Sequence, residues 1–108
     1  MTTFDDRERA FETKFAHDED MKFRAIARRN RLLGEWAARQ MGLSDVETEN
    51  YAKDVIRADF EEAGDEDVIR KLLGDLTSAG VEIDEGAIRE ALAHKEVEAK
   101  RQLMEAQG

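Results

Sequence analysis

Apolar residues recur along the chain at the three- and four-residue spacing of an amphipathic helix, and four segments show this spacing clearly. The spacing predicts helices over residues 19–41, 45–63, 66–79 and 85–106. No segment alternates apolar and polar residues as a half-buried strand does. Because short connections make neighbouring helices antiparallel, we predict an all-α protein built as a small antiparallel four-helix bundle.

The apolar stripes of these segments are the predicted core. The first stripe contains Phe23, Ile26, Ala27, Leu33, Ala37 and Met41, widened by Leu32 and Trp36. The second contains Val46, Ala52, Val55, Ile56, Phe60 and Ala63, and the third contains Val68, Ile69, Leu72, Leu73 and Leu76. The last contains Ile88, Ala91, Leu92 and Ala99, and it thins beyond Lys95. Asp59 falls inside the second stripe, and since a buried carboxylate needs a partner, we interpret it as paired with an arginine or a helix N-terminus.

Glycines and capping residues mark the predicted helix ends. A glycine follows each of the first three periodic segments, at Gly42, Gly64 and Gly80. Ser44 and Glu47 have the spacing of a capping box, in which each residue bonds the backbone N–H of the other. Asp65 and Asp84 are predicted to cap the third and fourth helices.

The N-terminal stretch carries its own aromatic face. Phe4, Phe11 and Phe15 share one side of a helix, with Glu8 at the fourth place. One interpretation is a helix whose phenylalanines dock on the bundle. The other is a segment, flexible or conditionally helical, that folds when it meets a partner. We therefore divide the chain into an N-terminal segment, 1–19, and a helical domain, 20–108.

The length of 108 residues predicts one compact domain, and the absence of cysteine excludes disulfides and thiol chemistry. The sequence contains no apolar run long enough to span a membrane and no secretory signal, so we expect a cytoplasmic protein without membrane insertion. The net charge of −9 argues against general nucleic-acid binding. Residues 21–40 are the exception, because they hold six bases and one acid.

Few residues are candidates for chemistry. His17 and His94 lie far apart in polar surroundings, without a nucleophile or a second ligand at a useful spacing. The acidic runs lack the ligand spacing of a calcium loop, and no glycine-rich phosphate loop is present. We expect no enzyme, no metal and no cofactor. Arg24, Arg28 and Arg31 share one helical face, where they either balance the acidic bundle or contact an acidic surface or a phosphate.

Three parts of the sequence together resemble one protein family. They are TFDDRERAFE with KFAHD at residues 3–12 and 14–18, ARRNRLLGEWAA at 27–38, and ADFEEAGDEDV at 58–68. Their order and spacing resemble the zeta subunit, the small inhibitor of the F-type ATP synthase in alphaproteobacteria. The resemblance covers nearly the whole chain and weakens after Val81.

The resemblance implies a four-helix protein that inhibits ATP hydrolysis by inserting its N-terminal helix into the catalytic head, where that helix contacts the central rotor. It also implies that rotation in the direction of ATP hydrolysis is blocked, whereas ATP synthesis is left largely uninhibited. The implied partner-binding residues are Phe4, Asp5, Arg7, Glu8, Phe11 and Phe15, with Arg24, Arg28 and Arg31 as a secondary contact. The protein would then be monomeric alone and peripheral at the inner membrane through the ATP synthase. The alternative is a helical module that binds a nucleotide or nucleic acid through the arginine cluster.

Overall fold

The computed structural model describes residues 3–61 and 64–107. Within these ranges the chain forms five helices and no strand: α1 (Thr3–His17), α2 (Glu19–Gln40), α3 (Asp45–Glu61), α4 (Asp65–Ser78) and α5 (Glu85–Gln107). The all-α prediction is confirmed, and the bounds of α2 to α5 lie within two residues of those predicted. The four-helix count and the flexible N-terminal segment are not confirmed: the described chain has five helices, because the N-terminal segment forms α1, which packs on α2.

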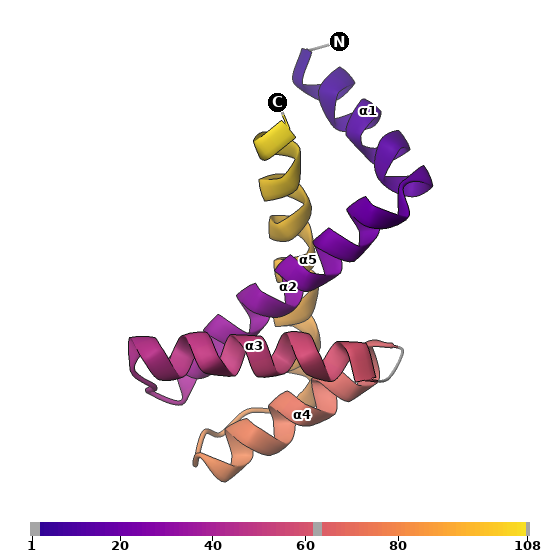
Figure 1. Ribbon diagram of the computed structural model, residues 1–108. Coiled ribbons are helices and arrows are strands. Elements are labelled where there is room, and N and C mark those ends of the chain that lie inside the picture. Colours follow the sequence, from indigo (N-terminus) through magenta and orange to yellow (C-terminus); the bar gives the residue numbers. More distant parts are fainter. Residues whose placement is uncertain (1–2, 62–63, 108) are drawn as a thin grey trace.

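α2 is the central element of the fold and contacts all four other helices. α3 and α4 pack at one end of the molecule, and α1 lies at the other end near the last turns of α5, so the two termini are on the same side (Figure 1). The molecule is elongated, with principal extents of 48 × 27 × 27 Å. This shape separates the buried side chains into two clusters.

The main core joins α2, α3, α4 and the first half of α5. Its buried side chains are Leu33, Ala37, Val55, Val68, Ile69, Leu72, Leu76, Ile88 and Leu92. Gly34 allows α2 and α3 to approach closely, because a methyl group at this position would lie 2.8 Å from the Ala52 Cα atom. The four segments with predicted stripes therefore do share a core.

The second cluster is smaller and lies at the α1 end. It consists of the buried residues Phe11, Met21, Ala25 and Leu103, with the half-buried Phe15 and Met104 packed against them. α1 thus contributes Phe11 and Phe15 to this second cluster, and neither belongs to the main core.

The predicted helix caps are confirmed at two of three starts. The Ser44 backbone N–H donates to Glu47 at 3.0 Å, and the Glu47 N–H donates to the Ser44 hydroxyl at 3.2 Å. The bond from the Ser44 backbone N–H and, to a lesser extent, the Ser44 hydroxyl beside the carboxylate hold the pKa of Glu47 below its ordinary value. Asp84 accepts from the Ala87 N–H at 2.8 Å. The cap at Asp65 was wrong: Gly64, with φ 109°, precedes α4 without a side-chain cap, and Asp65 is the first helical residue.

Three predicted core residues are exposed instead. Phe23, Ile26 and Val46 expose 54%, 39% and 70% of their surface. On α2 the buried arc passes through Met21, Ala25, Arg29, Asn30, Leu33, Gly34, Ala37 and Ala38. This arc contains two polar residues, so hydropathy alone placed the buried face of the first half of α2 on the wrong side. The Phe60 side chain and Ala63 lie outside the described residues.

The Arg29 guanidinium group lies in the buried arc because polar side chains surround it. It is 3% exposed and donates from Nη1 to Asp65 at 2.9 Å and from Nε to Asn30 at 3.1 Å. Its Nη2 atom lies 3.8 Å from a carboxylate oxygen of Asp59, whose side chain is 13% exposed. The interpretation of Asp59 as a residue paired with an arginine is confirmed.

Candidate protein-interaction site

The helix α1 is joined to α2 by a single residue. Asp18 has an extended backbone, with φ −110° and ψ 106°, and accepts hydrogen bonds from the Asp20 and Met21 N–H groups at 3.0 and 3.2 Å. It is therefore the N-cap of α2, and the chain bends at this position. The basic residues Lys14 and His17 lie in the last turn of α1, where a positive charge interacts favourably with the helix dipole. The sequence encodes α1 and α2 as two separate helices.

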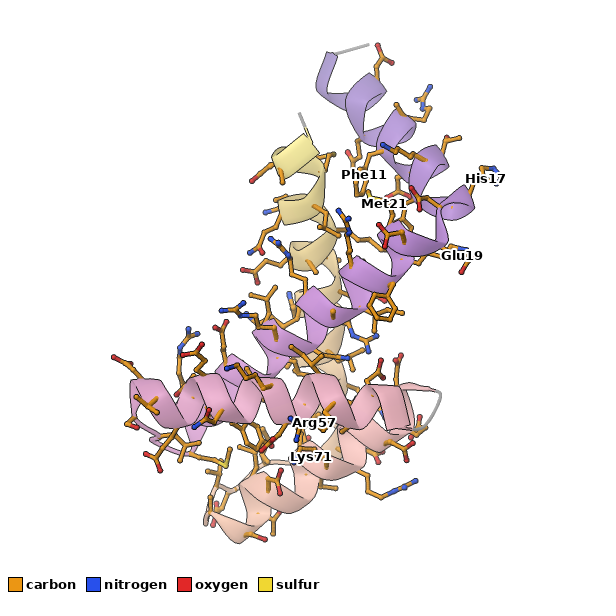
Figure 2. The ribbon with its side chains drawn as sticks, viewed as in Figure 1. Phe11, His17, Glu19, Met21, Arg57 and Lys71 are labelled. Atoms are coloured by element: carbon orange, nitrogen blue, oxygen red, sulfur yellow. The ribbon has the colours of Figure 1, made fainter. Side chains whose placement is uncertain are left out.

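An aromatic pair forms the buried face of α1. The ring centroids of Phe11 and Phe15 are 6.1 Å apart, with planes inclined by 32°. Phe11 is 8% exposed and packs in the angle between α1 and α2, where Met21 lies beside it (Figure 2). Such tilted aromatic pairs combine a large apolar area with a favourable ring geometry.

The last turns of α5 supply the surface that receives this pair. Leu103 is buried against Phe11, and Met104 packs on the same cluster. The Lys100 Nζ atom lies 4.8 Å from the centroid of the Phe15 ring, within the range of a cation–π interaction. Apolar and cationic groups of α5 thus both hold the phenylalanines.

A small groove runs along the contact between α1 and α5. Its volume is about 340 Å³, and it is lined by Glu8, Phe11 and Glu12 of α1 and by Val97, Lys100, Arg101 and Met104 of α5. The lining residues of α1 are acidic around the phenylalanine, and those of α5 include two bases. The opposite charges favour this mutual orientation of the two helices.

The structure brings part of the predicted site together. Phe11 and Phe15 pack against each other, and Glu8 is exposed at the groove beside them. The side chains of Phe4, Asp5 and Arg7 lie outside the described part of the structure.

The predicted arginine cluster is satisfied largely by partners in this chain. Arg24 lies 3.0 Å from Asp20 and Arg31 lies 3.8 Å from Glu35, both one turn away on α2. Arg28 donates to the Gln102 side-chain oxygen on α5 at 3.1 Å. These pairs place Arg24 and Arg31 beside carboxylates and reduce the net charge that this face offers to a phosphate.

His17 and His94 are both exposed, and Figure 2 places His17 on the outer side of the bend between α1 and α2. Across residues 3–61 and 64–107, no group of three or more acidic or histidine side chains is arranged to hold a metal ion. Over the same ranges, no helix combines the length and the apolar character needed to cross a membrane.

The contribution of α5 to the site was missed in the sequence. Its apolar stripe does not end at the predicted Ala99 but continues to the buried Leu103, four residues further on. Charged residues between these positions hide the stripe from a hydropathy average. Spacing alone, extended from Ile88 at three- and four-residue steps, was the signal that reaches Leu103.

Comparisons with known proteins connect this architecture to a family. The family model described as ATPase inhibitor subunit zeta matches residues 1–102. A structure solved by solution NMR is 46% identical, with a TM-score of 0.71, over 80% of this chain and 98% of that chain. No curated protein matches the chain.

Proposed function

The chain belongs to the ATPase inhibitor subunit zeta family, and from this premise we propose that α1 is the inhibitory element, which inserts Phe11 and Phe15 into the catalytic head of an F-type ATP synthase and blocks hydrolytic rotation. The observation that carries the proposal is the aromatic pair on a helix outside the main core. Aromatic side chains are the residues that most often dominate the energy of a protein interface.

The remaining predicted contacts of α1 fit a supporting role. Asp6, Glu8, Arg9 and Glu12 are exposed around the aromatic face. Exposed charges at an interface rim set orientation and association rate more than affinity. We infer that Phe4, Asp5 and Arg7 extend the same contact toward the central rotor.

The proposal predicts that a Phe11→Ala, Phe15→Ala variant loses inhibition. Truncating an interface anchor typically costs about 2 kcal/mol or more, and 2 kcal/mol corresponds to about a 30-fold change in the dissociation constant. ATP hydrolysis by an isolated catalytic head is measured against inhibitor concentration. The variant is expected to leave hydrolysis nearly uninhibited at concentrations where the parent saturates, while its helical circular dichroism persists because the main core is intact.

Phe23→Ala is the matched control, because it removes the same side chain from an exposed position on α2. It is expected to inhibit like the parent. If Phe23→Ala abolishes inhibition and the α1 variant does not, the contact lies on α2 beside the arginines, and the proposal is wrong.

A further inference from the structure

The phenylalanines assigned to the ATPase interface are already occupied inside the free protein. Phe11 is 8% exposed, and Phe15 packs beside it under Lys100. Resting on the proposed function, we propose that the last turns of α5, through Lys100, Leu103 and Met104, are an intramolecular docking site that competes with the ATPase for the aromatic face of α1. α1 must then leave α5 before the two phenylalanines can be buried in the partner.

The geometry makes the two states mutually exclusive. A side chain that exposes 8% of its surface has almost no area left to contact another protein, so the face of Phe11 that is buried against α2 and α5 cannot contact the ATPase at the same time. Glu8 and Glu12 of α1 line the same groove as Lys100 and Arg101 of α5, and their opposite charges favour this placement of α1 on α5.

The docking site is separate from the part of the protein that maintains the fold. The main core uses the first half of α5 through Ile88, Ala91 and Leu92, whereas α1 packs near Leu103, beyond the main core along the same helix. A single residue, Asp18, joins α1 to α2, and its cap on α2 does not involve α1. α1 can therefore move away by rotation at Asp18 while the main core stays folded.

Docking raises the apparent dissociation constant for the ATPase, which equals the intrinsic constant divided by the fraction of molecules in which α1 is free. If α1 is free in roughly a tenth of the molecules, the apparent dissociation constant is raised about tenfold. Variants of Phe11 weaken docking and ATPase binding together, so they cannot reveal this competition. Variants of α5 weaken docking alone and are expected to produce a better inhibitor.

The test uses the full chain with Leu103→Ala, and separately with Lys100→Ala, which removes the cation–π contact without touching a buried apolar position. Val46→Ala is the control for an apolar truncation, since Val46 is exposed on α3. Lys95→Ala is the control for loss of a lysine on α5, where Lys95 lies 3.2 Å from Glu98. Amide hydrogen exchange of α1 in the free protein and the concentration that halves ATP hydrolysis are measured for each.

In both α5 variants we expect the amide hydrogens of α1 to exchange faster than in the parent. We also expect each variant to halve ATP hydrolysis at a concentration about three- to tenfold lower than the parent does. The two control variants are expected to behave like the parent. Faster exchange with unchanged or weaker inhibition means that docking does not compete, and the inference is wrong. Unchanged exchange means that these residues do not hold α1, which also overturns it. Failure of the proposed function gives a different result from failure of this inference. If α1 is not the inhibitory element, the Phe11→Ala, Phe15→Ala variant still inhibits ATP hydrolysis.

Discussion

At the scale of single residues, the fold depends on a few positions whose roles differ from their hydropathy. Arg29 is a charged residue in the buried arc of α2, and it is tolerated because Asn30, Asp59 and Asp65 surround its guanidinium. Phe23 is a large apolar residue that stays exposed. Periodicity predicted the existence of α2, but only the packing partners decide which arc of that helix is buried.

Gly34 offers a test of the close contact between α2 and α3. A Gly34→Ala variant places a methyl group 2.8 Å from the Ala52 Cα atom, so the helices must move apart. We expect a loss of about 1–3 kcal/mol in the free energy of unfolding, the usual cost of overpacking, measured by urea denaturation.

Gly74→Ala is the control for the Gly34 variant. Gly74 also lies inside a helix, but a methyl group there meets no atom within 4 Å. It is expected to stabilise the protein by roughly 0.5–1 kcal/mol, because alanine is the better helix former. If Gly34→Ala stabilises to the same extent, α2 and α3 are not in the close contact described.

At the scale of elements, the sequence was most informative where local chemistry decides the structure. The capping box at Ser44 and Glu47, the cap at Asp84, and the positive φ values of Gly42 and Gly80 all follow from short-range backbone requirements. These signals predicted the bounds of four helices within two residues.

Short-range signals of this kind could not predict that α1 packs against α2 and α5. Its aromatic face is visible in the sequence, but whether that face packs internally depends on Leu103 and Met104, about ninety residues away. Local rules contain no information on such a distant contact. For this reason the sequence left open both a docked helix and a segment that folds on a partner.

The division of the chain near residue 19 stays a prediction, and a fragment of residues 18–108 tests it. This fragment keeps Asp18, the N-cap of α2, and all of the main core. We expect cooperative melting and helical circular dichroism, with a lower midpoint because Met21, Ala25 and Leu103 lose their cover. Non-cooperative melting would mean that α1 is part of the folding unit and that the boundary is wrong.

At the scale of the whole molecule, the elongated shape separates stability from the proposed activity. The main core joins α2, α3, α4 and the first half of α5, and the smaller cluster holds α1 at the opposite end (Figure 1). In our account, the main core is a stable body and α1 is the detachable inhibitory element.

The most direct test of this account is a titration of ATP hydrolysis by an isolated F-type catalytic head, with the full chain and with the folded 18–108 fragment in parallel. We expect saturable inhibition by the full chain. We expect no inhibition by the fragment at the same concentrations, because the fragment lacks Phe11 and Phe15. Inhibition by the fragment equal to that of the full chain would show that α1 is not the inhibitory element and would assign the activity to the main body of the protein.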